Sequence, residues 1–245
     1  MRVALFVTCV ADLLSPAAAF ATARLLRRLG CTVDFPEGQT CCGQPAWNSG
    51  YAGEAERAAG AMLDAFESAD YVVSPSGSCV GMIRHSYPHL FSTDAAMAER
   101  ARRLAGKTYE LSQFVVNVLN VTDVGATFKA RATFHPSCHA ARLLGVRDEP
   151  LQLLRAVRGL TLLPLTRGED CCGFGGTFAV KLAQISSAMV DEKAERIEAT
   201  GATHLVSTDL GCLLNIAGRL ARRRARIRAL HLAEILTEGT GESAP

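Results

Sequence analysis

The sequence lacks a strong net charge and any long apolar run. Its 245 residues carry a formal net charge of +2, so no overall field indicates a nucleic-acid ligand. No apolar run approaches the roughly 18 residues that a membrane-spanning helix requires. The apolar start at residues 3–7 is too short for a signal-peptide core and favours a strand. We therefore expect a cytoplasmic protein with no nucleic-acid partner and no membrane span.

Motifs of several enzyme classes are also missing. The glycine-rich stretch 173–176 lacks the G-x-G-x-x-G spacing of a dinucleotide site, and neither a flavin motif nor a separate acid–base pair stands out. Cysteines two to four residues apart, which are typical of structural zinc sites, are absent as well. The sequence therefore offers no ready catalytic machinery of its own, and any chemistry must come from another pattern.

The pattern that is present is a duplicated arrangement of cysteines. Two adjacent cysteines followed by glycine occur at 41–43 and again at 171–173. A single cysteine before each triplet and another after it also have counterparts in the other half, and each is separated from its counterpart by nearly the same number of residues as the triplets. The two sets of four are Cys9, Cys41, Cys42 and Cys79, and Cys138, Cys171, Cys172 and Cys212. This near-constant separation indicates an internal duplication with one four-thiol site in each half.

Strand and helix patterns alternate in both halves. Strands are predicted at 2–8, 31–35, 71–74, 109–111, 132–135, 160–165 and 204–207. Helices are predicted at 15–29, 53–69, 95–104, 112–119 and, as one long helix, 178–200. Such alternation predicts an α/β fold with mostly parallel sheets. We expect two duplicated Rossmann-like modules, residues 1–125 and 126–245, joined by a turn at 122–130 and related by a pseudo-twofold axis.

This layout places the cysteines just beyond the carboxyl ends of predicted strands, the edge at which parallel sheets bind ligands. Gly43 and Gly173 permit the backbone turn that aims two adjacent sulfurs inward, and Gly175 and Gly176 allow close backbone approach to a bound group. Four thiolates suit zinc or an iron–sulfur cluster equally well. The spacing favours a cluster over zinc, and the duplicated pattern favours metal binding over inert buried thiols. Cys31 has no counterpart and is expected to be a packing residue.

Five stretches carry a resemblance to a known family. They are PEGQTCCGQPAWNSGY, SPSGSCVGMIRHSYP, FHPSCHAARLLG, EDCCGFGGTFAVK and STDLGCLLNIAG. From residue 3 to about residue 236 the chain resembles the cysteine-rich (CCG) domain family, which includes the cysteine-rich component of heterodisulfide reductase and the glycolate oxidase iron–sulfur subunit. The resemblance is closest to the lactate utilization protein A family.

This resemblance implies an iron–sulfur subunit that transfers electrons in the oxidation of L-lactate to pyruvate. It implies two partner proteins of lactate utilization, one of them a ferredoxin-type iron–sulfur protein. The alternatives are a thiol/disulfide reductase subunit of the heterodisulfide reductase type and a glycolate oxidase iron–sulfur subunit. A third class of function is a scaffold protein whose fold is stabilised by bound zinc.

One position in each half departs from the heterodisulfide reductase pattern. That type has a cysteine three residues before the last one, where this chain has Ser76 and Asp209. Four thiols per site, instead of five, favour an ordinary [4Fe-4S] cluster in each module, with zinc as an alternative in the first.

Three polar residues near Cys138 are candidates for a catalytic role. His135 and His139 flank this cysteine, and Arg142 follows one helical turn later. They would bind a small carboxylate or tune a cluster through hydrogen bonds. The alternative is that the histidines cap a helix and that the arginine is solvated.

Overall fold

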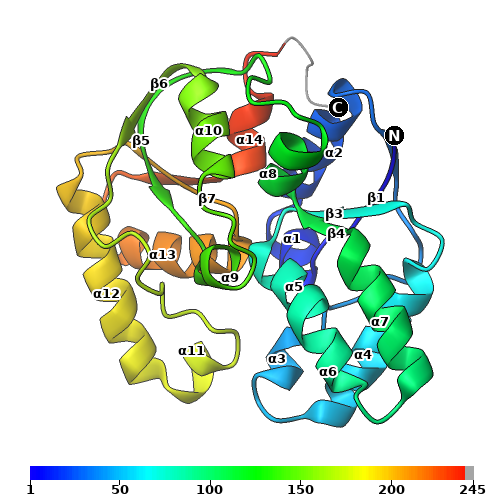
Figure 1. Cartoon of the computed structure of the whole chain (residues 1–245). Helices are drawn as coiled ribbons and strands as arrows, with labels where there is room; N and C mark the ends of the chain where they lie inside the picture. Colours follow the sequence, from blue (N-terminus) through cyan, green and yellow to red (C-terminus); the bar gives the residue numbers. More distant parts are fainter. Residues whose placement is uncertain (241–245) are drawn as a thin grey trace.

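Two four-stranded, all-parallel sheets form the framework of the protein (Figure 1). The computed structural model describes residues 1–240, and the strand orders are β2-β1-β3-β4 and β6-β5-β7-β8. The strands are β1 Arg2–Leu5, β2 Thr32–Asp34, β3 Tyr71–Ser74, β4 Thr108–Glu110, β5 Thr127–His135, β6 Arg158–Leu163, β7 His204–Ser207 and β8 Arg228–His231. The second order repeats the first strand by strand, which confirms the predicted duplicated α/β fold.

Helices make the crossover connections that parallel strands require. The first half contains α1 Cys9–Leu14, α2 Pro16–Arg28, α3 Gln44–Trp47, α4 Ala52–Ala65, α5 Gly77–Gly81, η1 Met82–Ser86, α6 Tyr87–Leu90, α7 Ala95–Lys107, α8 Leu111–Gln113 and η2 Phe114–Val118. The second half contains α9 Cys138–Arg142, α10 Glu149–Ala156, α11 Phe178–Lys181, α12 Ala183–Ala199, α13 Leu210–Arg222 and α14 Leu232–Thr237. Within residues 1–240, no helix has the length and apolar character needed to cross a membrane.

The structure corrects two boundaries predicted from the sequence. Strand β5 already begins at Thr127, inside the stretch 122–130 that was expected to be a turn. Its polar first half pairs with the edge strand β6 and is largely exposed, so it lacks the apolar signal of a buried strand.

The expected helix 178–200 breaks at Leu182, whose backbone is not helical. Helix α11 before the break contains no buried residue, so no core contact holds it in line with α12. The final residues 241–245 of the second predicted module lie outside the described part of the chain.

The two halves share a hydrophobic core. Val3, Leu25 and Phe114 of the first half pack in one cluster with Leu154 and Ile235 of the second. Figure 1 shows the reason: α14, at the end of the chain, lies against α2, while α10 lies beside α8. Each half therefore covers apolar surface of the other, so removal of either half would expose this cluster to water.

A second link between the halves lies at the ends of the outer strands. His231 ends β8 and caps α14, and its Nε2 lies 3.0 Å from the carbonyl oxygen of Pro75 in the first half. The equivalent residue at the end of β4 is Glu110, which is fully buried and caps α8. Its Oε2 accepts hydrogen bonds from the backbone N–H groups of Ser112 and Gln113, at 2.8 and 3.1 Å. In the described part of the chain, its Oε1 has no hydrogen-bond partner.

Glu110 should make stability depend on pH. Burial raises its pKa from 4.5 to about 7, so between these values the folded chain holds a proton that the unfolded chain has lost. The free energy of unfolding should therefore fall as pH rises through this window, by about 3 kcal/mol in all, and the loss should level off above pH 7. Glu110→Gln removes this contribution. Urea unfolding at pH 5 and pH 8 should show the variant gaining stability relative to the native chain at the higher pH, and a pH-independent difference would contradict the assignment.

Candidate metal centre

The four clustered cysteines outside the Cys-Cys-Gly loops lie where helices begin after the central strands of each sheet. Cys9 opens α1 after β1, and Cys138 opens α9 after β5. Cys79 lies in α5 after β3, and Cys212 lies in the first turn of α13 after β7. Backbone N–H groups at these helix starts favour negative charge, and thiolates are stabilised there.

The paired cysteines depend on a left-handed glycine. Gly43 has φ of 80° and Gly173 has φ of 81°, a region that residues with a side chain rarely adopt. A Cβ atom on Gly173 would lie 2.8 Å from the carbonyl oxygen of Ser186 in α12. The Gly173 N–H donates a hydrogen bond to the Cys171 Sγ at 3.4 Å. Glycine is therefore needed both for the turn and for the close contact with the neighbouring helix.

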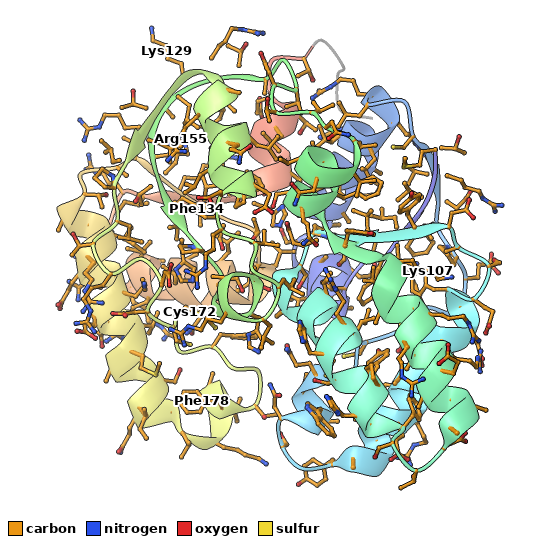
Figure 2. The ribbon with its side chains drawn as sticks, in the orientation of Figure 1. Lys107, Lys129, Phe134, Arg155, Cys172 and Phe178 are labelled. Atoms are coloured by element: carbon orange, nitrogen blue, oxygen red, sulfur yellow. The ribbon has the colours of Figure 1, made fainter. Side chains whose placement is uncertain are left out.

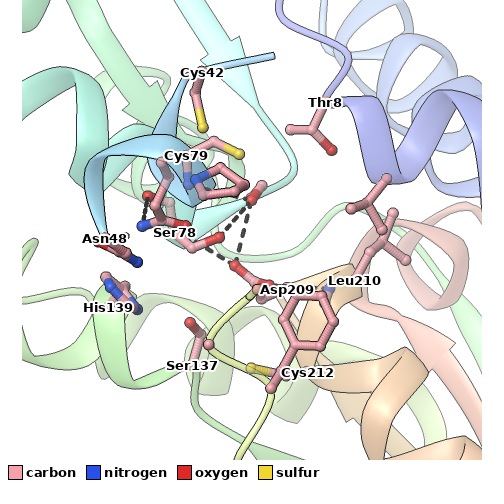
Figure 3. A pocket seen from close by; sticks show the side chains of 18 of the residues that line it. Thr8, Cys42, Asn48, Ser78, Cys79, Ser137, His139, Asp209, Leu210 and Cys212 are labelled. Carbon is pink, nitrogen blue, oxygen red and sulfur yellow. Dashed lines mark hydrogen bonds between the residues drawn. The ribbon is translucent and has the colours of Figure 1, made fainter. Parts of the chain in front are cut away.

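The eight cysteines of the two sets line one cavity between the halves. Its volume is about 140 Å³. Figure 3 shows Cys42 and Cys79 on one side, Cys212 on the opposite side and Asp209 between them. The predicted glycines Gly175 and Gly176 also line this cavity, as do Phe174 and Thr8, which the sequence did not single out. Two sites that looked separate in sequence therefore face each other across a shared space.

Within the first half, the thiols interact as a connected group. The Sγ atoms of Cys9 and Cys41 are 3.7 Å apart, and Cys41 also contacts Cys42, which contacts Cys79. Hydrogen bonds from Cys42 and Cys9 lower the pKa of Cys41 to about 2, whereas the same contacts raise the pKa values of its two donors. One thiolate is thus stabilised by neighbouring thiols, and binding of a cation would release the remaining protons.

The second group has the same connectivity. Cys171 contacts Cys138 and Cys172, and Cys172 contacts Cys212. The hydrogen bonds from Cys138 and Cys172 lower the pKa of Cys171 to about 2. This group has one addition, because a ring nitrogen of His135 lies within 4.8 Å of the Sγ atoms of both Cys172 and Cys212, which are themselves within that distance of each other.

The three polar candidates occupy different surroundings. His135 is fully buried, and within residues 1–240 its ring nitrogens have no hydrogen-bond partner. Burial lowers its pKa to about 3, so the ring is neutral. His139 lines the cavity, with Nδ1 3.6 Å from the Cys138 Sγ. Arg142 is exposed and donates to the carbonyl of Glu169 at 3.0 Å, outside the lining of the cavity. The structure therefore brings both histidines to the thiols but not the arginine.

Ser76 and Asp209 meet at the junction of the halves. The Ser76 hydroxyl donates to Asp209 Oδ2 at 3.3 Å, and the Ser78 N–H donates to the same oxygen at 2.9 Å. Ser76 also caps α5, and Asp209 caps α13. Both side chains are buried in this network. They serve as hydrogen-bonding caps at the positions where the heterodisulfide reductase pattern has a further cysteine.

The residues present fit a thiolate-bound metal group. Each half supplies four sulfurs from three loops to one wall of a common cavity, and soft sulfur donors select zinc or iron–sulfur clusters. By contrast, Cys31 is buried in the core cluster shared by the halves, away from that cavity. The structure thus separates the eight clustered thiols from the ninth.

Comparison with known proteins places these features in a family. The family model described as "Cysteine-rich domain" (CCG) matches residues 3–84 and 132–217. The chain is 57% identical to Lactate utilization protein A of Bacillus licheniformis over 96% of this chain and 99% of the relative. It is 56% identical to the Bacillus subtilis protein of that name and 58% identical to the Geobacillus kaustophilus protein, over 96% of the chain in each case.

A solved structure shares the fold at low sequence identity. A hypothetical protein from Helicobacter pylori matches 99% of this chain with a TM-score of 0.68 and 12% identity. The chain spans 49% of the length of that protein, and at this identity the likeness shows the fold alone.

Proposed function

This chain belongs to the cysteine-rich (CCG) domain family and groups with lactate utilization protein A, and from this premise we propose that it is an iron–sulfur electron-transfer subunit for the oxidation of L-lactate to pyruvate. The observation that carries the proposal is the pair of four-thiol groups facing one cavity. The proposed ligands are those eight cysteines, with one [4Fe-4S] cluster per half, each half corresponding to one module.

A bound cluster would supply one-electron storage and transfer. The chain's own residues hold and shape the site. Glycines at 43 and 173 turn the paired cysteines inward, and the helix starts direct N–H groups toward the thiolates. The Ser76–Asp209 contact holds the two walls of the cavity together.

The proposal includes partner proteins. Conversion of lactate to pyruvate releases two electrons and two protons, which calls for a site that binds lactate and for an electron acceptor. We propose that two further lactate utilization proteins, one of ferredoxin type, provide these functions. The relatives are named Lactate utilization protein A, and the letter in this name supports a system of several proteins.

The alternative of a disulfide reductase is less well supported. Its five-cysteine site would need a thiol at position 76 or 209, and these residues are instead caps engaged in hydrogen bonds. A glycolate oxidase iron–sulfur subunit would use the same thiols, so substrate and partners distinguish it. Zinc in the first group would mark a structural role for that half.

Anaerobic purification followed by iron, sulfide and zinc analysis tests the cofactor. We expect iron and sulfide at the ratio of two clusters per chain, and zinc alone would contradict the proposal. The isolated chain should then show little lactate oxidation, with activity appearing when the two partner proteins are added. Rapid turnover of lactate by the chain alone would place the catalytic site here after all.

A further inference from the structure

The residue that precedes the first cysteine of each group differs between the halves. Phe6 lies three residues before Cys9 and directly follows the central strand β1, and His135 lies three residues before Cys138 and ends the central strand β5. Phe6 is fully buried with its ring edge-on to Phe66 at 5.8 Å. The second half therefore places a ring with two nitrogens where the first half places a hydrocarbon ring.

The nitrogens of His135 lack partners on the protein side. The ring is fully buried, and within residues 1–240 neither nitrogen has a partner with hydrogen-bond geometry, although the Gly168 backbone lies near enough to raise the pKa of the ring slightly. A buried polar atom without a partner costs free energy, so such an atom requires an explanation. The sulfurs of Cys172 and Cys212 lie within 4.8 Å of a ring nitrogen and could accept a ring N–H once they are charged.

A second difference of the same kind lies on the long helices. Gly43 approaches Ala55 of α4 in the way that Gly173 approaches Ser186 of α12, which aligns these two helices with each other. Counted onward from Ala55 and Ser186, this alignment pairs Met62 with Lys193. Both contact the stretch before the paired cysteines, but in chemically different ways.

Met62 is an apolar neighbour, whereas Lys193 brings a buried cation. The Met62 Sδ accepts the N–H of Thr40 at 3.4 Å. Lys193 is 1% exposed, and its Nζ donates to the carbonyls of Arg167 and Gly168 at 3.1 and 2.9 Å. Burial lowers the pKa of this ammonium group, and its charge interacts with Asp170 and Arg196 as well as with Cys172 and Cys171.

We propose that His135 and Lys193 make the second cysteine group the centre of higher reduction potential, so that electrons pass from the first group to the second. The inference rests on the proposed function. Reduction adds a negative charge to a cluster, and an N–H donor to a ligand sulfur or a nearby cation stabilises the charged form. The first group has Phe6 and Met62 at the equivalent positions, and these side chains supply neither an N–H donor nor a cation. One electron leaves the first centre as the second gains it, and no bond is broken.

The test uses substitutions that copy the first half into the second. His135→Phe and Lys193→Met are made in the full chain, purified anaerobically and titrated with dithionite under electron paramagnetic resonance, with the two signals assigned through Cys212→Ser. Each variant should lower the potential of the second centre, so that its reduced-to-oxidised ratio at a fixed potential falls about tenfold, or about 59 mV for one electron. The first centre and the iron count should stay unchanged.

Lys129→Met is the matched control. This lysine is exposed and lies at the edge of the molecule, far from Cys172 in Figure 2, so both potentials should stay unchanged. A lower potential at the second centre of the native chain would overturn the inference, as would unchanged potentials in both variants. If His135→Phe loses iron while Lys193→Met keeps it, His135 would be a ligand of the metal, and this result would overturn its assignment as a hydrogen-bond donor. A native chain without iron would instead overturn the proposed function itself.

Discussion

Cys212→Ser should remove the second metal centre and leave the first, about halving the iron per folded chain, because each group holds its own metal with its own four sulfurs. Cys212 is buried in the first turn of α13, and its sulfur interacts with that of Cys172. A serine hydroxyl is a poor ligand for iron compared with a thiolate, and it would leave one position of the proposed cluster without a soft donor. Iron and sulfide should be counted per folded chain, since loss of a metal can also unfold the half that binds it.

Two matched substitutions complete this experiment. Cys79→Ser should remove the first centre and spare the second, which reverses the pattern in the resonance spectrum. Cys31→Ser is the control, because this thiol is buried in the shared core away from the cavity. It should keep all its iron, at a cost on the order of 1–3 kcal/mol in stability if the new hydroxyl is left unpaired. Full iron in Cys212→Ser would refute the ligand assignment.

Gly173→Ala should be strongly destabilising and should also weaken metal binding in the second half. The substitution combines two penalties, since φ is 81° and the new Cβ would lie 2.8 Å from the Ser186 carbonyl oxygen. The left-handed backbone costs about 1–2 kcal/mol, and the contact adds about 1–3 kcal/mol because a backbone atom of α12 must move. Any shift of the turn displaces the neighbouring Cys171 and Cys172. Urea unfolding and iron content should both report the change.

Gly125→Ala separates the two causes. Gly125 has φ of 74°, but a Cβ atom there would have no neighbour within 4 Å. The free energy of unfolding of the Gly125→Ala variant should therefore fall by only about 1–2 kcal/mol, and this variant should keep its iron. Equal losses in the two variants would show that the contact with α12 carries no weight.

The sequence by itself determined the repeated fold and the identity of the clustered thiols. The near-constant separation between equivalent cysteines needs no coordinates, since a duplication is written in the order of residues. The strand and helix periods then placed the thiols at the carboxyl ends of parallel strands, where the structure has them. The separation between Cys9 and Cys138 would also have paired His135 with Phe6, whereas the pairing of Lys193 with Met62 required the helix contacts of Gly43 and Gly173.

Only the tertiary structure decided how the two groups relate. It placed both on one cavity, joined Ser76 to Asp209 and turned Arg142 toward the Glu169 carbonyl. It also packed α14 against α2, which lies in the other half of the chain. Local periodicity records which face of an element is apolar, but it carries no information about which distant face covers it or where a polar side chain then points. Those outcomes depend on how the halves bury each other's surfaces, and they exist only when both are folded together.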